Sequence, residues 1–258
     1  MGKLLDLLHR AFGRGTAVDG VAISAVGSES ASCPSCNATL VKFPLRKIAC
    51  PQCDQPIYSR TRPSDGRKVL LSEAQVAIVE EQWAAKNGTL VQLRAERSRV
   101  ENARDELRSK FGRDPSENDV RWKVLTENAI TNASDGNIGL YRNTRFEMSE
   151  LLRKEGRSLQ SLHLLLAVCY LDANGPQNTS GWGDMERKWF SLSEAFLAPG
   201  ILSRTGKLID GLGLSEAEVF HHFITATKAY ASWPGIVLSP DDAWKAIWGA
   251  LNSSTEGR

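Results

Sequence analysis

The chain has 258 residues, 41% of them hydrophobic and 24% charged, and a formal net charge of +2 at pH 7. This balance is that of an ordinary globular protein, long enough for one large domain or for two or three smaller ones. The small net charge gives no reason to expect a polyanionic partner for the whole surface, and no stretch approaches the roughly 20 apolar residues needed to cross a bilayer. The charge is uneven, however, because residues 31–71 carry +5 and the rest of the chain −3.

The N-terminal part predicts a short helix and a linker. Residues 1–12 have the pattern of one amphipathic helix, but Asp6, His9 and Arg10 interrupt its apolar residues, so the segment does not match a secretory signal. Residues 13–32 are rich in Gly, Ser and Ala and predict a flexible tether. We therefore assign residues 1–30 to a helix with a tether, and the helix could dock on its own protein or on a partner.

Four of the five cysteines form two Cys-Pro-x-Cys pairs separated by thirteen residues. Two residues between the cysteines of a pair allow one tight turn to present both sulfur atoms to a single ion, and two such turns complete a tetrahedron. Asn37 and Asp54 follow the pairs and are expected in the left-handed conformation. A site with four thiolates has no open position, so we predict one structural Zn²⁺ ion. Its ligands are Cys33, Cys36, Cys50 and Cys53.

Cysteine usage also indicates the compartment. Paired cysteines that bind metal, in a chain of this length, favour a reducing environment over a disulfide framework, which predicts a cytoplasmic protein. Cys169 lies in an apolar helical stretch and is expected to be a buried core thiol.

Residues 33–62 resemble a rubredoxin-type zinc ribbon, with Asn37 and Asp54 where that ribbon usually has glycine. The ribbon continues as a strand at Ile57–Tyr58, and an arginine-rich hairpin, a helix and the segment 141–148 come after it. This arrangement resembles a group of uncharacterised bacterial and phage zinc-ribbon proteins. The resemblance implies a prokaryotic setting and brings no known activity.

The ribbon domain, residues 31–71, predicts short strands near 39–43, 46–49, 57–62 and 67–71, with a hairpin turn through Pro63–Gly66. Its basic and aromatic side chains could contact phosphates and stack on bases. These candidate contacts are Arg46, Lys47, Arg60, Arg62, Arg67, Lys68, Phe43 and Tyr58.

Everything after the ribbon predicts helices. Residues 72–113 are assigned to connecting helices, which start with a capping box at Ser72 and Gln75, and residues 114–258 to an α-helical domain starting at Asp114–Pro115. Residues 140–174 resemble one tetratricopeptide-like hairpin turning at Gly156. The core of that hairpin is expected to contain Met148, Leu152, Leu165, Val168 and Leu171. The predicted fold is mainly α with a small N-terminal β zinc ribbon, and the helices form a bundle or a short α-solenoid.

No cluster of residues has the pattern of a catalytic site, so we do not expect an enzyme. The favoured interpretation is a module that binds a protein partner through the ribbon and the grooves between helices. The alternative is nucleic-acid binding through the basic ribbon face at Arg46, Lys47, Arg60 and Arg62.

Overall fold

The computed structural model describes residues 17–18, 20–178 and 188–255. It is mainly helical with a small antiparallel sheet near the N-terminal side, which confirms the predicted fold class. The chain divides into two compact units, one ending at Arg99 and the other starting at Val100. Helix α3 (Leu90–Phe111) begins in the first unit and ends in the second. Residues 1–12, which are predicted to form a helix, and Trp182 lie outside the described residues.

The first unit is built on a three-stranded antiparallel sheet with the order β3-β4-β5. Its strands are β3 (Ile48–Ala49), β4 (Pro56–Thr61) and β5 (Lys68–Leu71). The turn from β4 to β5 closes as predicted, since Gly66 has a φ of +73° and the amide of Arg62 donates to the carbonyl of Arg67. The predicted strand at residues 39–43 is wrong: this segment contributes only an isolated bridge between Ser32 and Thr39.

Helix α2 (Glu73–Lys86) follows the sheet directly. The side chain of Gln75 accepts a hydrogen bond from the backbone amide of Ser72 at 3.0 Å, so the predicted start of this helix is confirmed. After its end, Gly88 adopts a φ of +69°, the left-handed conformation that commonly stops a helix.

The segment before the ribbon, expected to be a flexible tether, packs on the sheet and on α2. A two-residue pair, β1 (Ala17–Val18) and β2 (Val21–Ala22), precedes Ser28, which exchanges both backbone hydrogen bonds with Leu70. The buried side-chain amide of Gln82 donates to the carbonyl of Ala22 at 3.2 Å. At Gly27 a Cβ atom would lie 2.5 Å from a side-chain carbon of Leu71, so this close approach requires glycine.

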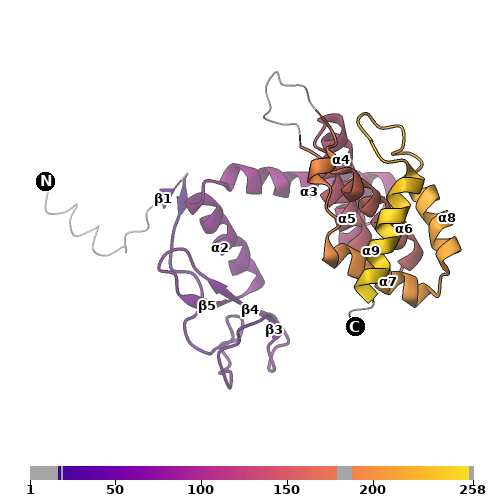
Figure 1. Ribbon diagram of the computed structural model, residues 1–258. Helices are drawn as coiled ribbons and strands as arrows, with labels where there is room; N and C mark the ends of the chain where they lie inside the picture. Colours follow the sequence, from indigo (N-terminus) through magenta and orange to yellow (C-terminus); the bar gives the residue numbers. More distant parts are fainter. Residues whose placement is uncertain (1–16, 19, 179–187, 256–258) are drawn as a thin grey trace, which may run out of the picture. The chain divides into compact units, whose positions relative to one another are not determined.

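The second unit is a helical bundle (Figure 1). The elements after α3 are α4 (Glu117–Ser134), α5 (Ile138–Lys154), α6 (Ser158–Asn174), the 3-10 turn η1 (Leu192–Glu194), α7 (Pro199–Leu212), α8 (Glu216–Thr227) and α9 (Pro240–Thr255). Helix α4 starts two residues later than predicted. Ser116 caps it, because its Oγ accepts from the amide of Asp119 while the Asp119 carboxylate accepts from the amide of Ser116.

Helix α6 is the centre of this bundle, packed against α5, α7, α8 and α9. Nearly all of its residues from Ser161 onward are buried, as expected for a helix that is apolar on every side. The hairpin α5–α6 packs closely where the Oγ of Ser161 donates to the carbonyl of Ser149 at 2.9 Å. The residues predicted for the hairpin core are all buried: Met148, Leu152, Leu165, Val168 and Leu171.

Two buried polar side chains, Asp172 and Asn174, hold the C-terminal end of α6 in place. Arg142 of α5 forms a two-point ion pair with Asp172 of α6, with Nε of the arginine 2.6 Å from Oδ1 of the aspartate. Asn174, which is fully buried, accepts hydrogen bonds from the amides of Val237 and Leu238 through its Oδ1 atom. These contacts attach the end of α6 to the helix before it and to the segment that leads into α9.

Among the described residues, no helix combines the length and the apolar character needed to cross a membrane.

Candidate functional site

The two Cys-Pro-x-Cys turns bring four sulfur atoms to one point. All four Sγ atoms lie within 4.8 Å of one another, and the Cys33–Cys53 and Cys36–Cys50 pairs are each separated by 3.8 Å. Tetrahedral metal–sulfur bonds of about 2.3 Å put sulfur atoms about 3.8 Å apart, whereas a disulfide needs about 2.05 Å. The four cysteines are therefore arranged as the ligands of one metal ion, and none is in a disulfide.

The same local turn builds each half of the site. The amide of Asn37 donates to the carbonyl of Cys33, and the amide of Asp54 donates to the carbonyl of Cys50, both at 2.9 Å. Asn37 and Asp54 have φ values of 60° and 57° and are the only non-glycine residues with positive φ in the described part of the chain. Their predicted left-handed conformation is confirmed, and it turns the chain so that both sulfur atoms of a pair face inward.

Hydrogen bonds and burial act in opposite directions on the thiols. Burial disfavours the thiolate of Cys33, but the backbone amides of Cys36 and Ser35 outweigh it and lower the pKa of this thiol to about 6. The amide of Gln55 lowers the pKa of Cys53, but burial and the three neighbouring sulfur atoms outweigh that amide and raise the pKa to about 12. Sulfur atoms this close cannot all ionise without a cation among them. The donor set therefore fits a divalent ion that takes four thiolates.

Three of the four cysteines also belong to the hydrophobic core of residues 31–71. Cys33 and Cys50 are buried beside three aliphatic side chains, Leu40, Ile57 and Leu70. Ile57 and Leu70 belong to β4 and β5, so the site is continuous with the sheet. Four protein ligands leave no open coordination position, which gives the site a structural and not a catalytic geometry.

The predicted basic face separates into two sets of side chains. Arg62 is only 5% exposed and is held by Glu29 and Asp65, while Nη1 of Arg67 lies 2.7 Å from Oε2 of Glu29. Arg62 lowers the pKa of Asp65 to about 2 through its hydrogen bonds. Arg62 and Arg67 are thus neutralised by acids and do not form part of an open cationic surface.

The remaining basic side chains of the predicted face are exposed at the surface. Lys47 places its Nζ atom 4.8 Å from the ring centre of Tyr58, and Arg60 lies 5.8 Å from the same ring. Arg46 and Lys68 are exposed. Phe43, in contrast, is half-buried against the ribbon core.

A groove along α4, which we call the α4 groove, lies on the surface of the helical unit. Three adjoining cavities of about 260, 500 and 360 Å³ follow this helix from Asp119 to Ser134. The first two share Trp122, and the second and third share Ile130. Phe111 and Ile130 are more than half exposed at the groove, although both are large apolar side chains.

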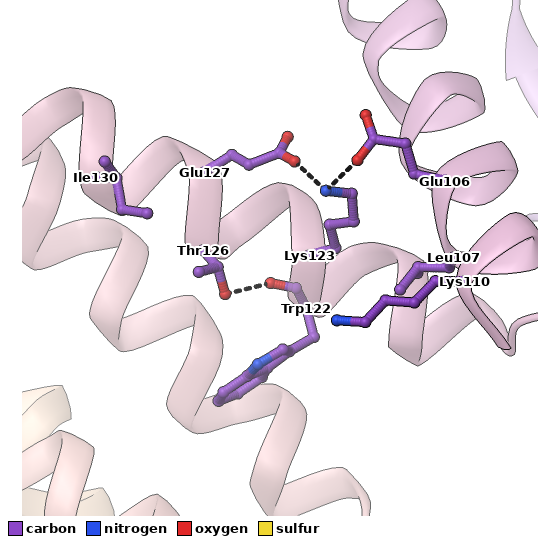
Figure 2. A pocket seen from close by; sticks show the side chains of 8 residues that line it. All are labelled: Glu106, Leu107, Lys110, Trp122, Lys123, Thr126, Glu127 and Ile130. Atoms are coloured by element: carbon purple, nitrogen blue, oxygen red, sulfur yellow. Dashed lines mark hydrogen bonds and ion pairs between the residues drawn. The ribbon is translucent and has the colours of Figure 1, made fainter.

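Figure 2 shows the middle cavity, which is lined by Trp122, Thr126 and Ile130 of α4 and by Leu107 and Lys110 of α3. Lys123 reaches between two carboxylates, 2.7 Å from Glu106 and 2.6 Å from Glu127. Lys110 makes no ion pair within the described part of the chain, and its Nζ atom lies 5.3 Å from the ring centre of Phe111.

The third cavity contains an arginine without a carboxylate partner. Arg145 of α5 lies 5.9 Å from the ring centre of Tyr141, and its Nε atom is buried with no hydrogen-bond acceptor among the described residues. Its nearest polar contact is the sulfur of Met148, 3.8 Å from Nη1. The sequence indicates grooves between helices only in general terms, because the residues of this groove come from three separate helices.

Comparison with protein-family models, with curated proteins and with solved structures finds no match to this chain. The likeness of residues 33–62 to a rubredoxin-type ribbon and of residues 140–174 to a tetratricopeptide-like hairpin therefore stays an expectation from the sequence.

Proposed function

We propose that the chain is a non-enzymatic protein-binding module. In this proposal one structural zinc ion closes the ribbon, and the helical unit binds an amphipathic helix of a partner protein in the α4 groove. The observation that carries the proposal is the α4 groove itself, with its exposed apolar side chains and, at one end, the Nε atom of Arg145, which has no hydrogen-bond acceptor among the described residues.

The donor set supports zinc in the ribbon. Tetrahedral sites with four sulfur ligands hold zinc or iron, and zinc alone of the two has no redox chemistry. Cys36 is exposed to solvent, where an iron–thiolate centre would be open to oxidation. A redox-inert ion is therefore the better match for a site whose role is to hold a small domain together.

The dimensions of the α4 groove support a helical partner. From Asp119 to Ser134 the groove follows α4 for about 22 Å, the length of about four helical turns. The large apolar side chains of Phe111, Trp122 and Ile130 are spaced along the α4 groove. Large side chains of this kind provide most of the affinity when a helix binds in a groove.

Charge supports an acidic partner. A buried N–H group with no acceptor costs about 1–3 kcal/mol, and that cost disappears when a carboxylate of the partner reaches Arg145. Lys110, which lines the middle cavity together with Trp122, also has no ion pair within the described residues. A second carboxylate of the partner could pair with it. We therefore expect a partner helix with apolar residues on one face and acids flanking that face.

Selection from a library of displayed helical peptides tests this proposal. We expect selected peptides to carry Leu, Phe or Trp at i, i+3 or i+4 spacing together with Asp or Glu. Replacing Ile130 by Glu should weaken their binding about 30-fold, the effect of losing about 2 kcal/mol at a central contact. Ile78→Glu is the matched control, since Ile78 is another exposed isoleucine, on α2. Peptides that bind the Ile130→Glu variant as well as the unmodified protein would refute the α4 groove as the binding site.

Nucleic-acid binding through the ribbon is the second candidate, favoured by the placement of Lys47 and Arg60 beside the ring of Tyr58. Such a surface would stack on bases and contact phosphates. It predicts binding of single-stranded oligonucleotides that weakens steeply with salt and is lost in Lys47→Gln/Arg60→Gln. Binding that is absent at low salt would remove this candidate.

A further inference from the structure

Three of the four histidines of the chain meet on the surface between α6 and α8. Nε2 of His163, on α6, lies 2.9 Å from Nδ1 of His222, on α8, and the two ring centres are 4.9 Å apart. The ring of His221 follows at 6.1 Å from that of His222. His163 and His222 are 59 positions apart in the sequence, so only the fold brings them together.

We propose that His163 and His222 form a second metal site, one that takes a divalent transition-metal ion of the nickel, copper or zinc class. This site is separate from the four cysteines and does not depend on the protein-binding function proposed above.

The distance between the two nitrogen atoms fits this role. Metal–imidazole bonds of about 2.0–2.1 Å that meet at 90–110° put the two nitrogens about 2.9–3.4 Å apart. The observed 2.9 Å lies within this range, so the separation of the two nitrogens need not change to admit an ion. Both side chains are half-buried, which holds the rings in place and leaves one side of the site open to water ligands.

The protonation state and the local charge also fit. Burial, with a contribution from His222, lowers the pKa of His163, so the imidazole is neutral near pH 7, as a ligand must be. Glu218 lies four positions before His222, on the same side of α8. Its carboxylate accepts hydrogen bonds from Ser215, which lower its pKa, and it supplies negative charge near the pair instead of a ligand.

The kind of ion follows from the donors. Imidazole nitrogen suits nickel, copper and zinc, whereas calcium and magnesium require oxygen ligands. Two protein ligands leave several coordination positions to water. The site is therefore suited to exchangeable binding, in contrast to the closed site of four thiolates.

Titration of the zinc-loaded protein with Ni²⁺ tests this inference, followed by calorimetry and by broadening of the imidazole NMR signals. We expect one Ni²⁺ ion to broaden the signals of His163 and His222, and His163→Gln or His222→Gln to weaken binding at least ~10-fold. His221→Gln is the matched control and should change the affinity less than ~2-fold, because the ring of His221 follows that of His222 at 6.1 Å and is not paired with His163.

Two results would overturn the second site. One is Ni²⁺ binding that is unchanged in both His163→Gln and His222→Gln, and the other is the absence of any binding below millimolar concentration. In either case the two rings share only a hydrogen bond. Binding through the cysteines is distinguished by sulfur-to-nickel absorption bands. If one glutamine variant fails to fold, the other variant and the NMR broadening of the unmodified protein still decide the question.

Discussion

Replacing Arg142 by Met should destabilise the helical unit strongly, because it leaves the carboxylate of Asp172 buried without its partner. The side chains of Arg142 and Asp172 are only 15% and 7% exposed, so solvent cannot substitute for the lost guanidinium. Breaking one side of a buried ion pair costs about 3–5 kcal/mol. For a unit of this size each kcal/mol lowers Tm by about 2–4 °C, so we expect a fall of about 6–20 °C.

The pH dependence of this loss follows from the carboxyl group. Burial raises the pKa of Asp172 in the folded state, and Arg142 partly opposes that effect. Without Arg142 the pKa of Asp172 in the folded state rises further. A carboxyl group with a raised folded-state pKa costs no stability below its unfolded-state pKa of about 4, because it is protonated in both states, and it destabilises the fold as the pH rises above that value. The stability deficit of Arg142→Met should therefore be largest near pH 7 and shrink as the pH falls towards about 4.

Urea unfolding followed by far-UV circular dichroism at several pH values measures both effects. Arg153→Met is the matched control on the same helix, since its pair with Glu150 is exposed on the arginine side and should contribute less than about 1 kcal/mol. The double variant Arg142→Met/Asp172→Leu should recover most of the lost stability. A cost for Arg142→Met equal to that of the control, or a deficit that grows on acidification, would refute this reasoning.

Two further predictions concern the ribbon. A strong zinc chelator should expose the amides of residues 33–61 to hydrogen exchange and leave α6 protected. The reason is that a structural zinc ion contributes about 10–16 kcal/mol to folding, whereas each of the few buried aliphatic side chains contributes only about 1.5–3 kcal/mol. Equal protection of residues 33–61 with and without chelator would contradict this. Asp54→Gly should be tolerated, whereas Asp54→Val should lower stability by at least about 1–2 kcal/mol, because the φ of 57° at this position is strained for a β-branched residue. Denaturant unfolding that finds the two variants equally stable would count against this prediction.

Local sequence signals predicted local structure well. The capping box at Ser72 and the left-handed turns at Asn37 and Asp54 were predicted because each depends on residues at most four positions apart. The start of α4 was misplaced because two caps compete there: Asp114–Pro115 has a suitable pattern, but Ser116 and Asp119 make the reciprocal hydrogen bonds.

Long-range contacts could not be predicted in this way. Arg62 was assigned to the basic face of the ribbon, yet Glu29, 33 positions earlier, pairs with it and allows it to be buried. The segment around Val41 has the composition of a strand, but Val41 is fully exposed and no neighbouring strand pairs with it among the described residues. The pairing of His163 with His222 likewise depends on how α6 packs against α8.

X-ray absorption on protein purified without chelators, combined with elemental analysis, tests the metal centre most directly. We expect one zinc ion per chain, bound by four sulfur atoms at about 2.3 Å. Cys36→Ser should lose this ion, whereas Cys169→Ala should keep it, because Cys169 is a buried core thiol whose pKa burial raises to about 12. Less than half an equivalent of metal, or a first shell made of nitrogen and oxygen, would contradict a ribbon held together by zinc.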